Sequence, residues 1–225
     1  MLDESKKNEI KKFVKEWVKR KFNELSKLDP SELHPNPFLL RALGIKENTK
    51  EAFEFGIRQR IERSLVTSFG QSVFETMLKI LGFEKSKIED IDLIFEKEGT
   101  KYFIQLKSGP EGFTRPALSK TKQTFEKIKS THPECKTVIA FGYGAAQRLS
   151  PIWGREAKES ADLLLIGKDF WDFFLGDGTY EELLKIFEEA GNEVVKETGE
   201  KEGLYITLVR KLLEKVKNLL QLEEI

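Results

Sequence analysis

The sequence is poor in the residues that build disulfides and zinc sites. It contains one cysteine, Cys135, and two histidines, His34 and His132, among 225 residues. A single cysteine cannot form an internal disulfide, and with two histidines it does not favour a zinc cluster. A core that depends on neither feature fits a reducing compartment.

Long hydrophobic runs are also missing. No apolar stretch approaches the roughly 18–20 residues of a membrane span, and the first twelve residues, MLDESKKNEIKK, are charged where a signal peptide would be apolar. We therefore expect a soluble, cytoplasmic protein without a membrane partner. The length, with 39% hydrophobic and 34% charged residues, suits one compact domain with an appended layer.

Net charge is absent, because 38 basic residues balance 38 acidic ones. The charges are nevertheless unevenly distributed. Residues 101–155 hold ten basic and three acidic residues, whereas acidic residues dominate from residue 156 onward. This asymmetry is compatible with one face that receives an anion, although surface charge runs are often only solvated. No GxxxxGK[ST] motif occurs, which disfavours an ATP-driven enzyme.

Apolar residues recur at helical spacing before the first strand. The pattern predicts three helices, at residues 5–28, 49–65 and 68–81. Thr49 or Asn48 is expected to cap the second helix and Ser68 the third, while Gly82 ends it.

Short apolar runs in the second half predict a sheet. The expected strands are residues 92–95, 102–107, 137–144 and 161–167, and the expected helices are residues 120–130, 169–176, 179–191 and 204–222. This order predicts an α/β fold with a mixed sheet between helices. We divide the chain into an amino-terminal helical layer, residues 1–66, and a core with the carboxy-terminal helix, residues 67–225.

One strand carries polar side chains where a buried strand should avoid them. Alternation along YFIQLK places Phe103, Gln105 and Lys107 on one face. If DLIF pairs antiparallel across the turn EKEGTK, Asp92 lies beside the end of this strand. A carboxylate and an amide oxygen suit Mg²⁺ that joins a phosphate substrate, and the lysine can orient a water molecule.

These residues carry a resemblance to a known group of enzymes. The pattern DIDLIF…YFIQLKSGP resembles the PD-(D/E)xK nuclease signature. The flanking segments TSFGQSVFE and GKDFWDFFLGD make the chain similar to type II restriction endonucleases, especially the group that cuts interrupted GG/CC palindromes. The similarity includes NPFLLRALGI and extends over about residues 33–178.

The resemblance implies a role for each matching residue. Asp92 would be the metal-binding carboxylate, with Asp90 as its rival, and Lys107 the catalytic lysine. Glu75 matches a glutamate that contributes to the metal shell directly or through water. Gln105 occupies the second acidic position of the catalytic and metal site, where the signature has an acid; some active members of the superfamily also have glutamine there.

Basic side chains near such a site hold the phosphate backbone of DNA without reading its sequence. Arg115, Lys120 and Lys122 are candidates for these contacts, together with Lys107 and Ser108. The alternative interpretation is that Arg115, Lys120 and Lys122 are ordinary solvated charges on a helix.

The resemblance therefore implies a restriction-endonuclease-like fold and a Mg²⁺-dependent enzyme of a restriction-modification system. Its substrate would be double-stranded DNA, cut by a homodimer at a palindromic site. We expect the amino-terminal helices and the last helix to contribute to dimerisation, and the amino-terminal layer also to DNA binding. The alternatives are an Mrr-like or structure-selective nuclease of repair or defence, and a DNA-binding module without catalysis.

Overall fold

A computed structural model describes residues 2–109, 114–145, 147, 149 and 151–223 of the chain. Contacts between residues divide it into two units. The first, hereafter the sheet unit, consists of residues 1–10 and 74–186, and the second, the helical unit, of residues 11–73 and 187–225. Each unit is described separately below.

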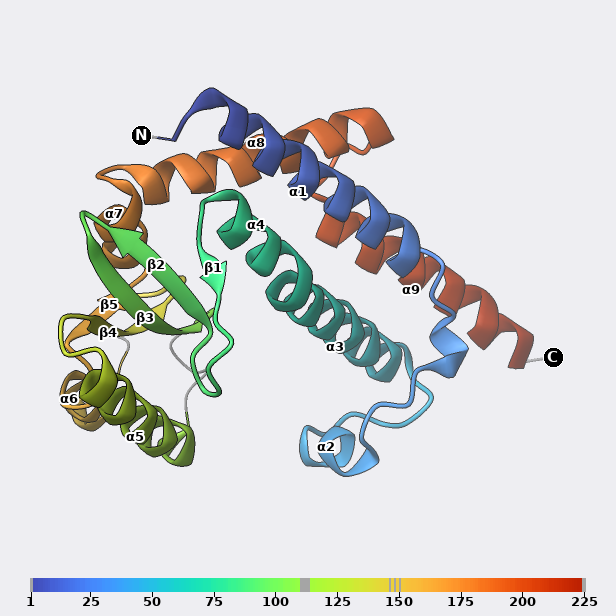
Figure 1. Cartoon of the computed structure of the whole chain (residues 1–225). Coiled ribbons are helices and arrows are strands. Elements are labelled where there is room, and N and C mark those ends of the chain that lie inside the picture. The colour runs from blue at the N-terminus through green and yellow to red at the C-terminus, as the bar shows by residue number, and fades with distance from the viewer. Residues whose placement is uncertain (1, 110–113, 146, 148, 150, 224–225) are drawn as a thin grey trace. The chain divides into compact units, whose positions relative to one another are not determined.

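The sheet unit is built around five strands in the order β1-β2-β3-β4-β5 (Figure 1). Their bounds are Glu84–Lys85 (β1), Leu93–Lys97 (β2), Thr100–Lys107 (β3), Lys136–Phe141 (β4) and Leu163–Ile166 (β5). The first three strands are antiparallel neighbours, and β3, β4 and β5 are parallel. The expected α/β class with a mixed sheet is confirmed.

A tight hairpin joins β2 to β3. Glu98 and Gly99 have φ values of 52° and 76°, which is the left-handed conformation that a two-residue hairpin turn of type I′ requires. The turn sets a register in which Leu93 faces Ile104 and Lys97 faces Thr100. The expected antiparallel pairing is therefore confirmed, and the start of β2 lies beside the end of β3.

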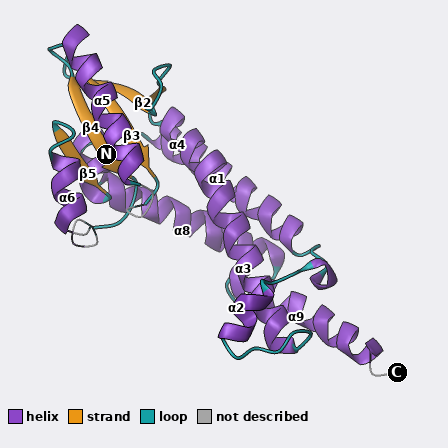
Figure 2. Cartoon of the chain, turned by 90° about the horizontal axis from the view of Figure 1, so that it is seen from below, coloured by secondary structure: helices purple, strands orange, loops and turns teal. Residues whose placement is uncertain are grey.

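Helices cover both faces of this sheet. The helices of the sheet unit are α4 (Glu75–Ile80), α5 (Arg115–Thr131), α6 (Pro151–Lys158) and α7 (Lys168–Leu175). On one face, a core cluster combines side chains of α5 and α6 with Phe103 and Ile139 of the sheet. On the other face, Tyr102 contacts Phe173 and Phe174 of α7. Figure 2 shows the strands in orange beside α5 and α6.

The start of α5 differs from the prediction, which placed the helix at residues 120–130. The helix begins at Arg115, because the Thr114 side chain accepts a hydrogen bond from Ala117 N and Pro116 lies in the first turn. Both features favour a helix start. The helix α6 was not predicted.

The helical unit has its own core. It includes α2 (Pro37–Ala42), α3 (Lys50–Ser68) and α9 (Leu204–Glu223), while α1 (Glu4–Leu25) and α8 (Thr179–Thr198) contribute residues to both units. Ile57 and Ile61 of α3 pack with Leu208, Leu212 and Val216 of α9, and all five side chains are buried. The helix α9 thus groups with helices from the start of the chain, which differs from the expected division at residue 66.

The prediction that Ser68 caps a new helix is wrong. The helix α3 passes without interruption into a π-helical turn, Phe69–Phe74, which continues into α4. The Ser68 hydroxyl instead accepts a hydrogen bond of 2.7 Å from Trp17 Nε1. Thr49 does cap α3, and Gly82, with a φ of 97°, follows the end of α4 as expected.

Candidate active site

Three polar side chains meet where β2 begins and β3 ends. Asp92 directly precedes β2, and its backbone N–H donates to Ile104 C=O at 3.0 Å, which continues the pairing of the two strands. Gln105 and Lys107 occupy alternate positions at the end of β3, so their side chains leave the same face of the sheet. The register of the hairpin therefore brings the three predicted residues together.

One oxygen of Asp92 receives all three partners. Asp92 Oδ2 accepts hydrogen bonds from Gln105 Nε2 at 2.7 Å and from the Leu106 backbone N–H at 2.9 Å. The ammonium of Lys107 lies 3.7 Å from the same oxygen. These contacts hold the carboxylate at the end of β3.

Gln105 is the most buried member of the site, with 5% of its surface exposed. Its amide nitrogen is engaged by Asp92, whereas its amide oxygen, Oε1, is buried and has no hydrogen-bond partner among the described residues. A buried acceptor without a partner costs about 1–3 kcal/mol. Such an oxygen is an unused ligand position beside a carboxylate.

The donor set fits a hard cation. Asp92 Oδ1 and Gln105 Oε1 are oxygen ligands of the kind that Mg²⁺ prefers, and Mg²⁺ commonly uses one or two carboxylates and keeps several waters. Among the residues that the structure describes, however, no three His, Cys, Asp or Glu side chains form a metal-binding group. Glu75 is exposed at the start of α4 and belongs to no such group within the described part of the chain.

The geometry separates the two rival aspartates. Asp90 adopts a φ of 63° before β2 and pairs with Lys120 Nζ at 3.0 Å, and Glu89 pairs with the same ammonium at 2.9 Å. Hydrogen bonds to Glu89 and Asp90 raise the pKa of Lys120 above its usual value. Asp92, rather than Asp90, accepts the hydrogen bond from the Gln105 amide.

The remaining predicted DNA contacts differ in their surroundings. Arg115, in the first turn of α5, lies 3.6 Å from Glu156, and Lys120 is held by its two acidic partners. Lys122 is exposed, seven positions after Arg115 and hence on a similar side of α5. Ser108 follows Lys107 and is partly buried.

Close backbone packing supports the end of β3, and the sequence did not predict that Gly142 and Tyr143 take part in it. Gly142 N–H donates to Lys107 C=O at 2.8 Å, and Tyr143 N–H donates to Ser108 C=O at 3.0 Å. The Tyr143 ring also lies so close to Gly109 that a Cβ there would come within 2.4 Å of the phenol. The alternation of aromatic residues and glycines in FGYG was the sequence signal of this packing.

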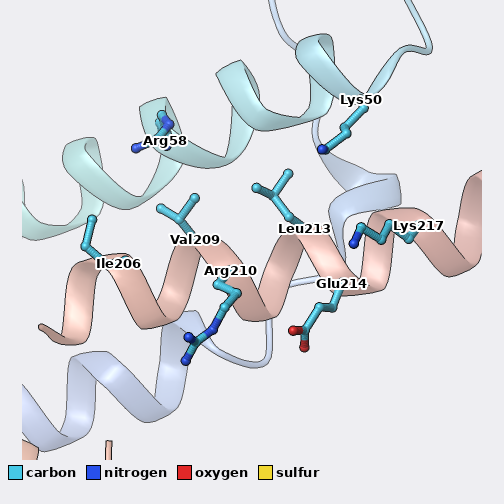
Figure 3. A pocket seen from close by; sticks show the side chains of 8 residues that line it. All are labelled: Lys50, Arg58, Ile206, Val209, Arg210, Leu213, Glu214 and Lys217. Carbon is cyan, nitrogen blue, oxygen red and sulfur yellow. The ribbon is translucent and has the colours of Figure 1, made fainter. Parts of the chain in front are cut away.

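The helical unit contains a separate hollow of about 390 Å³ between α3 and α9 (Figure 3). Its lining mixes four cations, one carboxylate and three apolar side chains: Lys50, Arg58, Arg210, Lys217, Glu214, Ile206, Val209 and Leu213. Arg58 is paired with Glu54 and Arg210 with Glu202. With one carboxylate and no nucleophile, this lining is a poorer candidate for catalysis than the Asp92 site.

Comparison with known families gives the class of protein to which the chain belongs. A family described as Type II restriction endonuclease EcoO109I matches residues 4–195, which is most of the chain. The fold and the match define a restriction endonuclease, a nuclease that acts on DNA. The chain belongs to the EcoO109I family of type II restriction endonucleases.

A search of curated proteins found no match. Within the described residues, no helix is long and apolar enough to cross a membrane.

Proposed function

We propose that the chain is a Mg²⁺-dependent, sequence-specific endonuclease of a restriction-modification system, which hydrolyses phosphodiester bonds of double-stranded DNA. The observation that carries this proposal is the convergence of Gln105 and Lys107 on one oxygen of Asp92. Family membership supports DNA as the substrate. The convergence corresponds to the PD-(D/E)xK arrangement with glutamine at the second acidic position.

In this proposal Asp92 and Gln105 would hold the cation with their side-chain oxygens. When bound, Mg²⁺ would lower the pKa of a water molecule and offset negative charge on the phosphate. The Leu106 N–H and the Gln105 amide keep the Asp92 carboxylate from rotating. Lys107, held near Asp92, donates hydrogen bonds to the attacking water or to a phosphate oxygen, and thereby offsets the developing charge.

Phosphate contacts outside the reacting group would come from the rim of this site. Ser108 follows the proposed catalytic lysine directly, and Arg115 and Lys122 lie about two turns apart on a similar side of α5. Lys120 would have to exchange Glu89 and Asp90 for a DNA phosphate. These contacts position the duplex and carry no sequence information.

We infer that the enzyme acts as a homodimer and cuts an interrupted GG/CC palindrome. Two-fold symmetry of protein and site lets each subunit cut one strand. The hollow between α3 and α9 supports this assembly, because Ile206 is 51% exposed at its edge and both signs of charge are present. A two-fold interface brings the same surface of both subunits together, so charges of both signs let a cation of one copy meet a carboxylate of the other.

The test is digestion of a long, fully sequenced duplex DNA by purified protein with Mg²⁺. Discrete fragments that are absent with Lys107→Ala support the proposal, and mapping of their ends gives the recognition sequence. A smear that is lost with Lys107→Ala supports a structure-selective or non-specific nuclease instead.

A DNA-binding module without catalysis is the second candidate, and the neutral Gln105 favours it because this residue brings no charge to a position where the signature has an acid. Tight DNA binding without cleavage at any Mg²⁺ concentration would identify this module. Cleavage that survives Lys107→Ala would show that the nuclease site lies elsewhere.

A further inference from the structure

Tyr143 is an exposed aromatic residue beside the Asp92 site. It lies two positions after β4, and 52% of its surface is exposed. Its backbone N–H donates to Ser108 C=O at 3.0 Å, and Ser108 directly follows the proposed catalytic lysine. Single exposed apolar residues are common on protein surfaces, so exposure alone assigns no role to this ring. The placement of its backbone and of its hydroxyl is more specific.

The backbone around Tyr143 is fixed to the strand that carries the site. Gly142 N–H donates to Lys107 C=O at 2.8 Å, which together with the bond from Tyr143 to Ser108 joins the two segments at consecutive residues. Gly142 C=O in turn accepts a buried hydrogen bond of 2.7 Å from Trp171 Nε1. The aromatic core therefore holds the backbone of Tyr143 in a set position relative to Lys107.

The hydroxyl end of the ring is packed against a glycine. A Cβ added at Gly109 would lie 2.4 Å from Tyr143 Oη and 2.4 Å from Cζ, so the phenol fills the space that a side chain at Gly109 would need. Gly109 follows Lys107 by two residues, which span at most about 7 Å of backbone. No described residue accepts a hydrogen bond from the hydroxyl. A phenol donor thus lies near the proposed catalytic lysine without a partner in the described part of the chain.

A phosphate of the DNA backbone suits this donor. Tyrosine hydroxyls are among the side-chain groups that bind DNA phosphates. The backbone distance from Lys107 to Gly109 is comparable with the distance between neighbouring phosphates of one DNA strand. A strand whose scissile phosphate lies at Lys107 therefore brings a second phosphate within reach of the hydroxyl. Because tyrosine has few rotatable bonds and this ring is already packed on Gly109, the contact costs little side-chain entropy.

We propose that Tyr143 positions the DNA strand for cleavage, because its hydroxyl donates a hydrogen bond to a backbone phosphate next to the one held at the Asp92 site. This inference rests on the proposed function and deepens it, since it adds a substrate contact outside the PD-(D/E)xK signature. The contact is independent of sequence and fixes the register of the strand at Lys107. Gly109 belongs to the same arrangement, because it leaves room for the phenol.

The experiment measures DNA affinity by fluorescence anisotropy of a labelled duplex in Ca²⁺, with a gel to verify that the duplex stays intact. Tyr143→Phe removes only the hydroxyl and keeps the ring on Gly109. It is expected to raise the Kd by about tenfold, because a hydrogen bond to a charged group is lost, and to leave the melting temperature unchanged. Tyr102→Phe, on the opposite face of the sheet against α7, is the matched control and should change neither quantity.

A scan of single phosphates then identifies the contact. In each duplex one phosphate near the mapped cleavage position is replaced by an uncharged methylphosphonate, and wild type is compared with Tyr143→Phe. At one position next to the scissile phosphate, the replacement should weaken wild-type binding by about tenfold and leave Tyr143→Phe nearly unaffected, because the variant has no contact there to lose. At the other positions the two proteins should respond equally.

The outcomes separate the inference from the proposed function. Equal affinity of wild type and Tyr143→Phe, or equal responses at every phosphate, overturns the inference alone. A loss of affinity in Tyr143→Leu but not in Tyr143→Phe assigns the contact to the ring and also overturns it. If the protein binds DNA without cutting it, the nuclease function fails, and the affinity ratio on an unmodified duplex still decides the inference. Protein that neither binds nor cuts DNA overturns both.

Discussion

Gly142 lies where neighbouring parts of the sheet unit leave no space for a side chain. A Cβ at this position would come within 2.3 Å of the Phe74 ring. The carbonyl of Gly142 accepts a buried hydrogen bond of 2.7 Å from Trp171 Nε1, and its N–H holds Lys107 C=O. The residue thus connects the aromatic core to the backbone of the candidate catalytic lysine.

We predict that Gly142→Ala lowers the free energy of unfolding by about 1–3 kcal/mol, because Phe74 must move within a packed core. At this chain length the melting temperature should fall by about 2–4 °C for each kcal/mol. Gly154→Ala is the control: its Cβ would meet nothing within 4 Å, and alanine favours the helix α6. Equal melting temperatures for the two variants would contradict the packing described for Gly142.

At the residue scale, the sequence predicted the positions of the site better than its contacts. Alternation along β3 and the hairpin register suffice to bring Asp92, Gln105 and Lys107 together. The partners of Lys120 were not predictable, because Glu89 and Asp90 lie on a turn whose conformation depends on the fold. The roles in metal and DNA binding remain predictions.

At the scale of elements, a ladder of ion pairs joins α1 to α8 within the helical unit. Three lysines on α1 and three glutamates on α8 alternate at four-residue spacing: Lys11, Lys15, Lys19, Glu189, Glu193 and Glu197. Hydrogen bonds from Lys11 and Lys15 lower the pKa of Glu193 from 4.5 to about 2. The charged form of Glu193 is therefore favoured in the folded state.

This shift predicts the sign of a pH effect. A carboxyl whose pKa is lower in the folded state stabilises the fold above its unfolded value of 4.5, and this contribution is lost as pH falls toward about 2. Glu193→Gln should therefore lower the melting temperature at pH 6, and the difference from wild type should shrink at pH 3 and in high salt.

Thermal unfolding of both proteins at each pH measures the difference. Glu188→Gln, at an exposed position of the same helix, serves as the control and should change little at either pH. A difference for Glu193→Gln that stays constant from pH 6 to pH 3 would exclude an ionic contribution.

The types of most helices and strands followed from periodicity, but several boundaries did not. Ser68 resembles a cap, yet α3 continues because its backbone passes into a π-helical turn and the hydroxyl binds Trp17. Thr114 and Pro116 do signal the start of α5, but the glycines and prolines around them favoured a loop. Tertiary contacts decide such cases, and they are absent from a local pattern.

At the scale of the whole molecule, the chain forms two cores from interleaved segments. The helix α9 packs on α3 through Leu212 and Ile61, although about 150 residues separate them in sequence. Amphipathic periodicity predicts that α9 has an apolar face, but it does not specify which partner covers that face. The sequence therefore predicted the helix and not the unit to which it belongs.

The proposed homodimer can be tested by light scattering after size-exclusion chromatography. We predict a mass of two chains, and we expect Ile206→Lys to shift the protein toward one chain, because it adds a cation to a contact whose lining already holds four. Leu184→Lys is the control, because Leu184 is similarly exposed but lies outside the α3–α9 hollow. A monomeric wild type at all concentrations would contradict the proposed assembly.

The most direct test of the Asp92 site is the single-turnover rate of DNA cleavage by two variants that each remove one carboxylate. We predict that Asp92→Asn lowers the rate by at least about a hundredfold, because the site loses the carboxylate that is proposed to hold the cation beside Gln105 and Lys107. We predict that Asp90→Asn, which disturbs the pairing with Lys120, changes the rate by a few fold at most. A large loss with Asp90→Asn and full activity with Asp92→Asn would contradict the assignment of the active site.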